Sequence, residues 1–340
     1  MSDHTAPTAP SSWRRVAGAV VLLTAIISLL LTAFAWPATR SEPRDLPIAV
    51  AGPEPMAQQV AAALAEERPG AFEVDVVADR DSAEQAILDR DAYAAFVLSP
   101  DGPPEVLTAS AASPAVAQVV NQIAQRLAAE QAPEATAPVP VTDVVPLPDD
   151  DPRGAGLTAG ALPLVLGGIL AAALLTQMLQ GAVRRLVGAL SFAVLGAVAM
   201  SAILQLWLGS LEGDYWANVG VTALSIAATS TTILGLEWSF GNPGLGLGAA
   251  VMMLLGNPLS GMASAPEMLP SGWGELGQLL PPGAAGTLLR STAFFDGAGA
   301  AGPVTVLASW VAIGFALCLL GSLRSRVRRT QPASAGAATA

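Results

Sequence analysis

The chain has 340 residues, of which 52% are hydrophobic and only 13% charged, about half the charged share of an average soluble domain. Its formal net charge is −11, and all 16 basic residues are arginines, so the chain lacks the lysine that a P-loop ATPase places on the phosphates. One cysteine excludes an internal disulfide, one Cys with one His excludes a structural zinc site, and the acidic balance argues against nucleic-acid binding. His4 lies in a Pro/Thr/Ser-rich tail that is typical of disorder, so we expect no enzyme activity and no bound cofactor.

The acidic residues are concentrated in one part of the chain. Residues 37–156 hold 20 of the 27 acids and 7 of the 16 arginines, a net charge of −13. The remaining residues carry a net charge of +2 and contain long apolar runs. The sequence therefore predicts a water-soluble domain over 37–156, attached to a nearly uncharged membrane domain.

Six apolar runs are long enough to cross a bilayer, because about 20 residues rising 1.5 Å each span a core of roughly 30 Å. The first run, within a helix over 16–36, ends in Ala33-Phe34-Ala35, which resembles a signal-peptide cleavage site. It is longer than the roughly 7–15 apolar residues of a signal peptide, which favours an uncleaved helix. We predict a polytopic α-helical membrane protein with six transmembrane helices, five of them in a membrane domain over 157–323. The runs are Val16–Ala35, Leu157–Leu179, Leu186–Leu208, Ala217–Leu236, Gly241–Met262 and Pro303–Leu323.

The arginines outside the acidic part lie mainly in three places: before the first run, between the second and third, and after the sixth. With six spans, all three places fall on one side of the bilayer, which the positive-inside rule assigns to the cytoplasm. We expect a multi-pass plasma-membrane protein with cytoplasmic tails, over 1–15 (disordered) and 324–340 (basic), and with an extracytoplasmic acidic domain. The topology determinants are Arg14, Arg15, Arg184, Arg185, Arg324, Arg326, Arg328 and Arg329.

The acidic part has the pattern of a small α/β domain between the first two spans. Ser82 and Gln85 match a capping box at a helix start, and Ser113 precedes Pro114 as a helix N-cap. Asp149–Asp151 is either a solvated linker or a weak divalent-cation site, and its lack of spaced ligands favours the linker. The predicted strands are Pro47–Ala51, Phe72–Val77, Tyr93–Leu98, Glu105–Thr108 and Val139–Leu147, and the predicted helices are Met56–Glu67, Ser82–Arg90 and Ser113–Leu127.

The fourth apolar run contains a cluster of hydroxyl residues. Thr222, Ser225 and Thr229 are candidates for lining a transport pathway. Hydroxyls in membrane helices more often bond to their own helix or to a neighbour, so packing is the favoured interpretation.

Residues 261–301 form an apolar segment that prolines interrupt, which excludes a continuous span. We predict short re-entrant helices at the outer face, because irregular backbone at membrane depth must be buried in protein or line a cavity. The segment is either an outer gate or a structural cap over the helices. Arg290 lies outside the cytoplasmic set and needs an acidic partner, for which Glu267, Glu275 and Asp296 are candidates. The possible gate residues are Asn257, Pro258, Ser260, Gly261, Pro270, Pro281, Pro282 and Arg290.

Several short motifs surround this segment and the start of the domain. They are Asn257-Pro258-Leu259-Ser260-Gly261, Leu280-Pro281-Pro282-Gly283, Phe295-Asp296-Gly297 and Pro47-Ile48-Ala49-Val50. Together with the order of one helix, a large insertion and five further helices, they make the chain resemble the type-two ABC exporter permeases. More narrowly, it is similar to the actinobacterial phage-infection-protein (YhgE/Pip-like) group.

The resemblance implies a permease, expected to be a homodimer, that moves lipids, drugs or polymers outward. ATP would be hydrolysed by a separate nucleotide-binding subunit, which agrees with the missing lysine. The alternative is a non-transporting surface or secretion-associated scaffold whose acidic domain binds a partner. An intramembrane enzyme is disfavoured, because the spans contain no usable His, Lys or charge pair.

Overall fold

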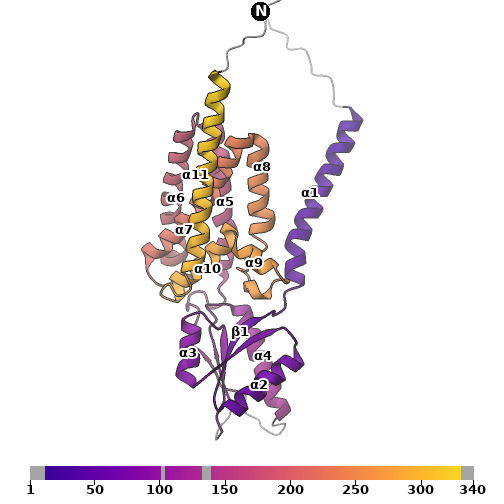
Figure 1. Cartoon of the computed structure of the whole chain (residues 1–340), viewed down its shortest axis with the longest axis vertical. Helices are drawn as coiled ribbons and strands as arrows, with labels where there is room; N and C mark the ends of the chain where they lie inside the picture. The colour runs from indigo at the N-terminus through magenta and orange to yellow at the C-terminus, as the bar shows by residue number, and fades with distance from the viewer. Residues whose placement is uncertain (1–11, 101–103, 132–138, 331–340) are drawn as a thin grey trace, which may run out of the picture.

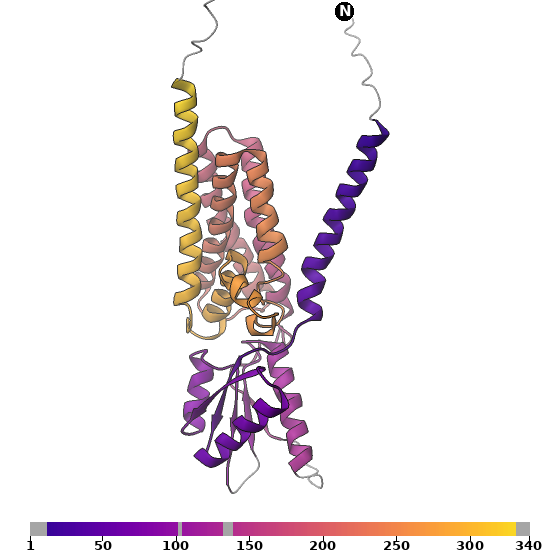
Figure 2. The ribbon, with the colours of Figure 1, turned by 45° about the vertical axis from the view of Figure 1, so that its right-hand side comes forward.

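The computed structural model describes residues 12–100, 104–131 and 139–330. Residues 1–11 and 331–340, which belong to the two predicted tails, lie outside the described part. The long helices run side by side, and a small domain built on a β-sheet lies at one end of them (Figures 1 and 2). Helix α1 (Trp13–Thr39) begins and helix α11 (Ala301–Thr330) ends at the opposite end.

Helix α1 stands apart from the other long helices (Figure 2). Its apolar side chains are exposed along nearly the whole length, which places them against lipid or another chain once a bilayer surrounds the protein. It approaches the rest of the molecule at its end, where the ring of Trp36 packs edge-on against Trp273 with centroids 5.5 Å apart.

The helical bundle is built around α7 (Tyr215–Phe240), most of which is buried. Around it pack α5 (Ala155–Met178), α6 (Ala182–Ser201) with its π-helical continuation η1 (Ala202–Trp207), and α11. Small residues permit this close approach: a Cβ placed on Gly168 of α5 would lie 2.6 Å from the Cβ of Thr229 on α7.

Among the described residues, five helices are long and apolar enough to cross a membrane: α1, α5, α6 with η1, α7 and α11. The predicted span 241–262 does not form a sixth helix of that length. It forms α8 (Asn242–Ala250), which continues as the π-helix η2 (Val251–Gly256) and ends before Pro258. Fifteen helical residues reach about 22 Å, which is less than the roughly 30 Å of a bilayer core. Helices α8 and η2 therefore do not cross the core by themselves, and any full crossing must include the irregular segment that follows.

That segment consists of short helices, as its prolines predicted. They are η3 (Pro266–Met268), α9 (Trp273–Gln278) and α10 (Pro281–Phe294). Pro281 and Pro282 occupy the first turn of α10, where a missing backbone N–H costs nothing. Helix α10 is almost entirely buried and packs against α7 and α11, so it forms part of the bundle interior at this end.

The domain between α1 and α5 is a five-stranded mixed sheet with the order β2-β1-β3-β4-β5. Strand β1 pairs in parallel with β2 and β3, β3 and β4 form the predicted antiparallel hairpin, and β5 is parallel to β4. One face is covered by α2 (Glu54–Glu67) and α4 (Pro114–Gln131), and the other by α3 (Arg80–Leu88). The strands are β1 (Leu46–Ala51), β2 (Phe72–Val77), β3 (Ala94–Val97), β4 (Glu105–Thr108) and β5 (Val141–Asp143).

Two predicted caps have different outcomes. The Ser113 hydroxyl accepts a hydrogen bond from the backbone N–H of Val116 at 3.2 Å, so Ser113 caps α4 as predicted. The Ser82 capping box is wrong, because the N-cap of α3 (Arg80–Leu88) lies three residues before Ser82. Its N-cap is Asp79, whose carboxylate accepts from the backbone N–H of Ser82 at 2.9 Å.

Candidate functional site

The outer segment, defined here as residues 257–300, shares its hydrophobic core with the α/β domain. Ala265 and Met268 pack among residues of β1 and β3 on one face of the sheet. Phe295, at the other end of the segment, packs against Ile87 and Leu107 on the opposite face. The segment therefore straddles the end of the sheet, and Figure 1 shows α9 and α10 at the end of the bundle that faces the domain.

Polar contacts strengthen this junction along the first half of the segment. The backbone N–H of Arg44 donates to the carbonyl of Glu267, and its guanidinium donates to the carbonyl of Leu269, both at 2.9 Å. The Ser113 hydroxyl, besides capping α4, donates to the carbonyl of Ser264 at 2.7 Å. These donors come from two separate parts of the domain, one before β1 and one before α4, so the segment is held at two places.

Arg90 makes the principal polar contact with the second half of the segment. Its Nη1 donates to the carbonyl of Thr287 at 2.9 Å and to the hydroxyl of Ser291 at 2.6 Å. Its guanidinium lies 5.2 Å from the centre of the Phe295 ring, within cation–π range. Burial lowers the pKa of Arg90 from its ordinary value, as expected for a charge between two packed elements.

Backbone strain is also concentrated at this junction. Among the described residues, three non-glycine residues have a left-handed φ: Asp45 (49°), Arg90 (67°) and Asp296 (49°). Asp45 precedes β1, Arg90 follows α3, and Asp296 lies at the end of the outer segment. Such conformations persist only where surrounding contacts hold them, and they cluster at sites that function or move.

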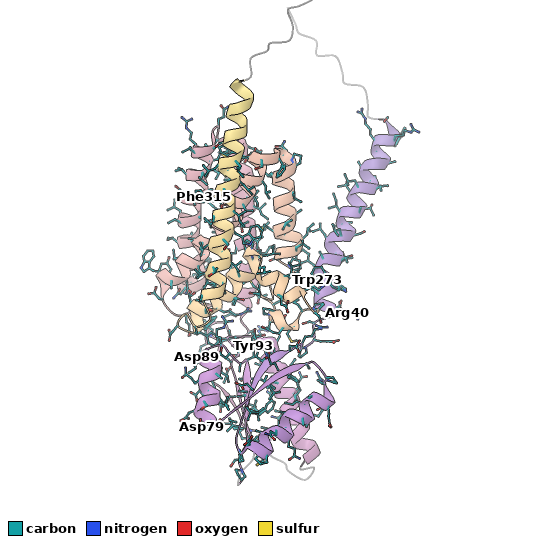
Figure 3. The ribbon with its side chains drawn as sticks, viewed as in Figure 1. Arg40, Asp79, Asp89, Tyr93, Trp273 and Phe315 are labelled. Atoms are coloured by element: carbon teal, nitrogen blue, oxygen red, sulfur yellow. The ribbon has the colours of Figure 1, made fainter. Side chains whose placement is uncertain are left out.

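Tyr93 and Glu267 join the domain to the outer segment across 174 residues of sequence: the Tyr93 hydroxyl donates to Glu267 Oε2 at 2.8 Å. Burial, with Glu267 close by, raises the pKa of Tyr93 well above its ordinary range, so the phenol remains a neutral donor. Figure 3 shows Tyr93 at the boundary between the domain and the bundle, far from Asp79.

Arg290, on α10, is 4% exposed. Its predicted acidic partner is not found: within the described residues, none of the ion pairs involves Arg290. Instead its Nη2 donates to the carbonyl of Met262 at 2.6 Å, and its Nε has no hydrogen-bond partner. The Glu267 carboxylate accepts a hydrogen bond from Tyr93, and it interacts with Arg290 only electrostatically. A buried cation with an unsatisfied donor raises the free energy of the folded state, so Arg290 destabilises this part of the segment while its other contacts stabilise it.

Four of the predicted gate residues line one groove of about 290 Å³ at the domain end of the bundle. The groove lies between the outer segment and the ends of α1 and α5, which contribute Phe34, Pro37 and Thr158. Pro270 lies in the turn before α9, whereas Pro281 and Pro282 begin α10. The four groove residues are Asn257, Pro258, Ser260 and Gly261.

The candidate pathway residues Thr222, Ser225 and Thr229 are all buried in α7. Their neighbours bond to backbone, as the packing interpretation expects: Thr231 donates to the carbonyl of Ala227 at 2.7 Å, and Thr232 to that of Trp310 at 3.2 Å. A pathway along Thr222, Ser225 and Thr229 stays a prediction.

A polar network that the sequence pattern did not reveal crosses the same region. The Asn218 amide donates to Gln205 Oε1 at 3.0 Å and accepts from the Thr292 hydroxyl at 2.7 Å. It therefore joins η1, α7 and α10 at the domain end of the bundle. An isolated Asn and Gln in apolar runs were the available signal, but their pairing depends on the position of α10.

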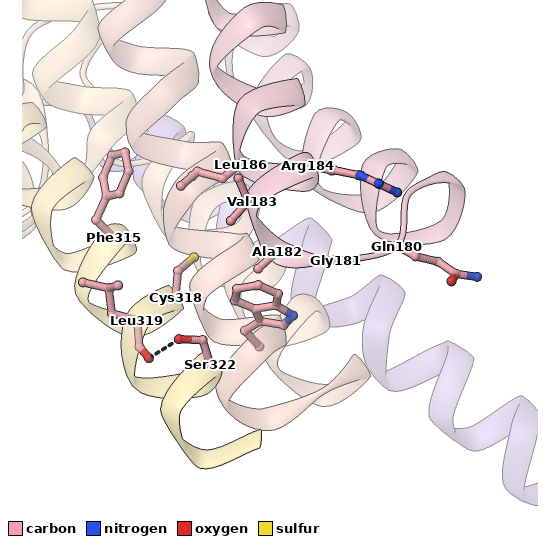
Figure 4. A pocket seen from close by; sticks show the side chains of 11 residues that line it. Gln180, Gly181, Ala182, Val183, Arg184, Leu186, Phe315, Cys318, Leu319 and Ser322 are labelled. Atoms are coloured by element: carbon pink, nitrogen blue, oxygen red, sulfur yellow. Dashed lines mark hydrogen bonds between the residues drawn. The ribbon is translucent and has the colours of Figure 1, made fainter. Parts of the chain in front are cut away.

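The opposite end of the bundle carries a partly buried ion pair. Arg185 Nη1 and Glu237 Oε2 are 3.0 Å apart, and Arg185 also donates to the carbonyls of Leu179 and Thr176, both at 2.8 Å. Arg185 is thus a structural residue as well as a predicted topology determinant. Beside the pair, a cavity of about 740 Å³ opens between the α5–α6 turn and α11 (Figure 4).

The arginine groups lie at this same end, away from the domain. Arg14 and Arg15 stand at the start of α1, Arg184 and Arg185 at the start of α6, and the remaining four in the last turns of α11. The start of α1 and the end of α11 are both remote from the sheet (Figures 1 and 2). The arrangement that the positive-inside rule needs is therefore present.

The described residues contain no group of three or more His, Cys, Asp or Glu side chains that could hold a metal ion. Asp151, from the acidic triplet, instead accepts hydrogen bonds from the backbone N–H groups of Ala155 and Gly156, at 2.8 and 2.7 Å. It thus supports the start of α5.

Comparison with known proteins identifies the family. A profile described as "ABC-2 family transporter protein" matches residues 18–323. The chain belongs to the ABC-2 transporter family. No curated protein and no solved structure matches, so the narrower phage-infection-protein group has no support beyond its motifs. As an ABC-2 transporter protein, the chain is a multi-pass membrane component of a transport system rather than an enzyme.

Proposed function

We propose that this chain is the permease subunit of an exporter that moves a lipid, drug or polymer-like substrate outward. A separate subunit hydrolyses the ATP, because the chain has no lysine for a P-loop. The permease acts as a homodimer in the plasma membrane. The observation that carries the proposal is the outer segment: broken helices buried in the bundle at one end and fixed to the α/β domain.

The proposed topology has six crossings, with α8, η2 and the start of the outer segment making the fifth. Both termini and the α5–α6 turn are cytoplasmic, and the α/β domain is extracytoplasmic. The three arginine groups at one end and the acidic domain at the other support this orientation.

The outer segment is the proposed gate, and the domain is its lid. The groove beside Asn257 and Ser260 would be the exit, and the contacts of Arg90 and Tyr93 would set when it opens. The scaffold alternative predicts a domain that works independently of the membrane helices. The shared cores around Met268 and Phe295 favour a domain that acts on the bundle.

Site-specific photo-crosslinking in the native host membrane tests the proposal. The chain has no lysine, so amine-reactive crosslinkers find no side chain and a photoreactive residue must be introduced. It is placed at Gln180, exposed in the α5–α6 turn, and for comparison at Gln58, exposed on α2 of the domain.

A protein with a Walker motif should crosslink at Gln180 and not at Gln58. Capture of such an ATPase at Gln58 alone would reverse the proposed orientation. Absence of any ATPase at Gln180, together with a specific protein captured at Gln58, would overturn the permease proposal and support the scaffold.

A further inference from the structure

The cavity of about 740 Å³ at the arginine-bearing end is open to the surroundings of the protein. It is a groove between α6 and α11, with Trp238 of α7 also lining it. Figure 4 shows Leu186 and Val183 of α6 on the opposite side of it from Phe315 of α11, while Arg184 projects away from the ring of Phe315.

The groove opens on the outside of the bundle rather than toward its centre. Val183 and Leu319, which line it, are 75% and 64% exposed. In a bilayer, apolar surface of this kind faces acyl chains, and a volume of several hundred Å³ suits a small-molecule ligand rather than a passing contact.

Among the described residues, the charged residue that lines the groove is basic. Glu237, the acid next to the groove, is committed to Arg185, which leaves Arg184 exposed at the rim. Helix α11 continues past Ser322, which lines the groove, to Arg324 and Arg326. Basic pockets between transmembrane helices on the cytoplasmic side bind anionic lipid headgroups.

From these observations we infer that the groove binds one anionic phospholipid. One acyl chain lies between Leu186 and Phe315, and the phosphate lies at Arg184. The lipid fills the space between α6 and α11, so it holds these helices at a fixed separation. The site depends on the groove and its charges, and not on an ATPase or on transport.

Native mass spectrometry of the full-length chain, purified in detergent, tests this inference. Phosphatidylglycerol and phosphatidylcholine with identical acyl chains are added in turn, and retained lipids are counted. We expect phosphatidylglycerol to be retained at least roughly fivefold more strongly, the ratio that one arginine near a headgroup supplies. Glycerol phosphate, which has the headgroup without the chains, should not be retained.

Three variants complete the test. Arg184→Gln should remove the preference for phosphatidylglycerol, whereas Arg14→Gln, at the exposed start of α1, should leave it unchanged. Val183→Trp, at an exposed position where folding is not at risk, should reduce retention of both lipids. Equal retention of the two lipids by the wild-type chain would overturn the inference. Loss of a dimer in Val183→Trp without loss of lipid would also overturn it, because the groove would then seat a second copy.

Discussion

Arg90 offers the sharpest test of the junction between the domain and the outer segment. Arg90→Met removes two hydrogen bonds and a cation–π contact but keeps much of the apolar stem. Hydrogen bonds from a charged donor contribute about 1.5–3 kcal/mol each, and the cation–π contact about 1 kcal/mol. Recovery of the guanidinium's lost hydration offsets part of this sum.

The partners of Arg90 moderate the cost. The Ser291 hydroxyl already donates to the carbonyl of Thr287 at 3.1 Å, so neither group is left without a partner in the variant. After this and the recovered hydration, we expect a net loss of about 2 kcal/mol, below the sum of the separate contacts and confined to the junction. Arg90→Gly removes the same polar contacts and the apolar stem as well, while it relieves the left-handed strain at φ 67°, which offsets about 1 kcal/mol of the loss.

Hydrogen exchange measured by mass spectrometry detects this loss of stability segment by segment. A loss of about 2 kcal/mol corresponds to roughly 30-fold faster exchange in the last turns of α10, if these amides exchange by local opening. Arg126→Met is the control, since Arg126 makes only an exposed 3.9 Å contact with Glu67 on the far side of the domain. Exchange in α10 within twofold of wild type, or equal acceleration in α2, would refute the reasoning.

Three further predictions follow from other contacts. Arg185→Leu leaves the partly buried Glu237 carboxylate without its partner, which should cost about 3 kcal/mol and lower the midpoint of thermal unfolding in detergent. The double variant with Glu237→Leu should recover most of that loss. Because the pKa of Tyr93 is raised in the folded state, its contribution to stability is complete below about pH 10 and is lost as the pH rises further. Hydrogen exchange of the outer segment should therefore accelerate at alkaline pH in the wild type, and this acceleration should be absent in Tyr93→Phe. Gly168→Ala should destabilise the bundle by about 1–3 kcal/mol in thermal unfolding, while Gly246→Ala, with open space at its Cβ, should be neutral or stabilising.

The sequence predicted the elements whose signals are local. Apolar runs located the five long helices, and alternating patterns with turn residues located the strands of the domain. It overestimated the length of the helix in the fifth apolar run, because the length of an apolar run does not show where the helix ends. The run continues to Met262, but the helix ends at Gly256, before the Asn257-Pro258 pair. The start of α3 was misplaced for a related reason: Asp79 and Ser82 are both good caps, and the pattern does not rank them.

The junction itself depends on contacts that no local pattern contains. Tyr93 and Glu267, and Arg90 and Ser291, lie 174 and 201 residues apart. The need of Arg290 for a partner was foreseen, but the partner is a backbone carbonyl created by the fold of the outer segment. Acidic side chains are visible in a sequence, whereas every residue has a carbonyl, so the sequence carries no signal for the one that Arg290 meets.

These contacts constrain how a gate at this end can move. Burying a Met or Phe side chain contributes about 1.5–3 kcal/mol, so separating the segment from the sheet at Met268 and Phe295 costs about 3–6 kcal/mol before any hydrogen bond is broken. Moving the domain and the outer segment together avoids this cost, but α10 lies in the core of the bundle, so its packing against α7 and α11 must loosen instead. The flexible points must then lie at the borders of that unit. Besides the links to α1 and α5, these borders are the π-helix η2, a form frequently found at functional sites, and the turn before α11, where Gly297 and Gly299 have positive φ. If the proposed gate opens in this way, it moves with the domain as one body about these borders, and a label on α3 then reports the motion of α10.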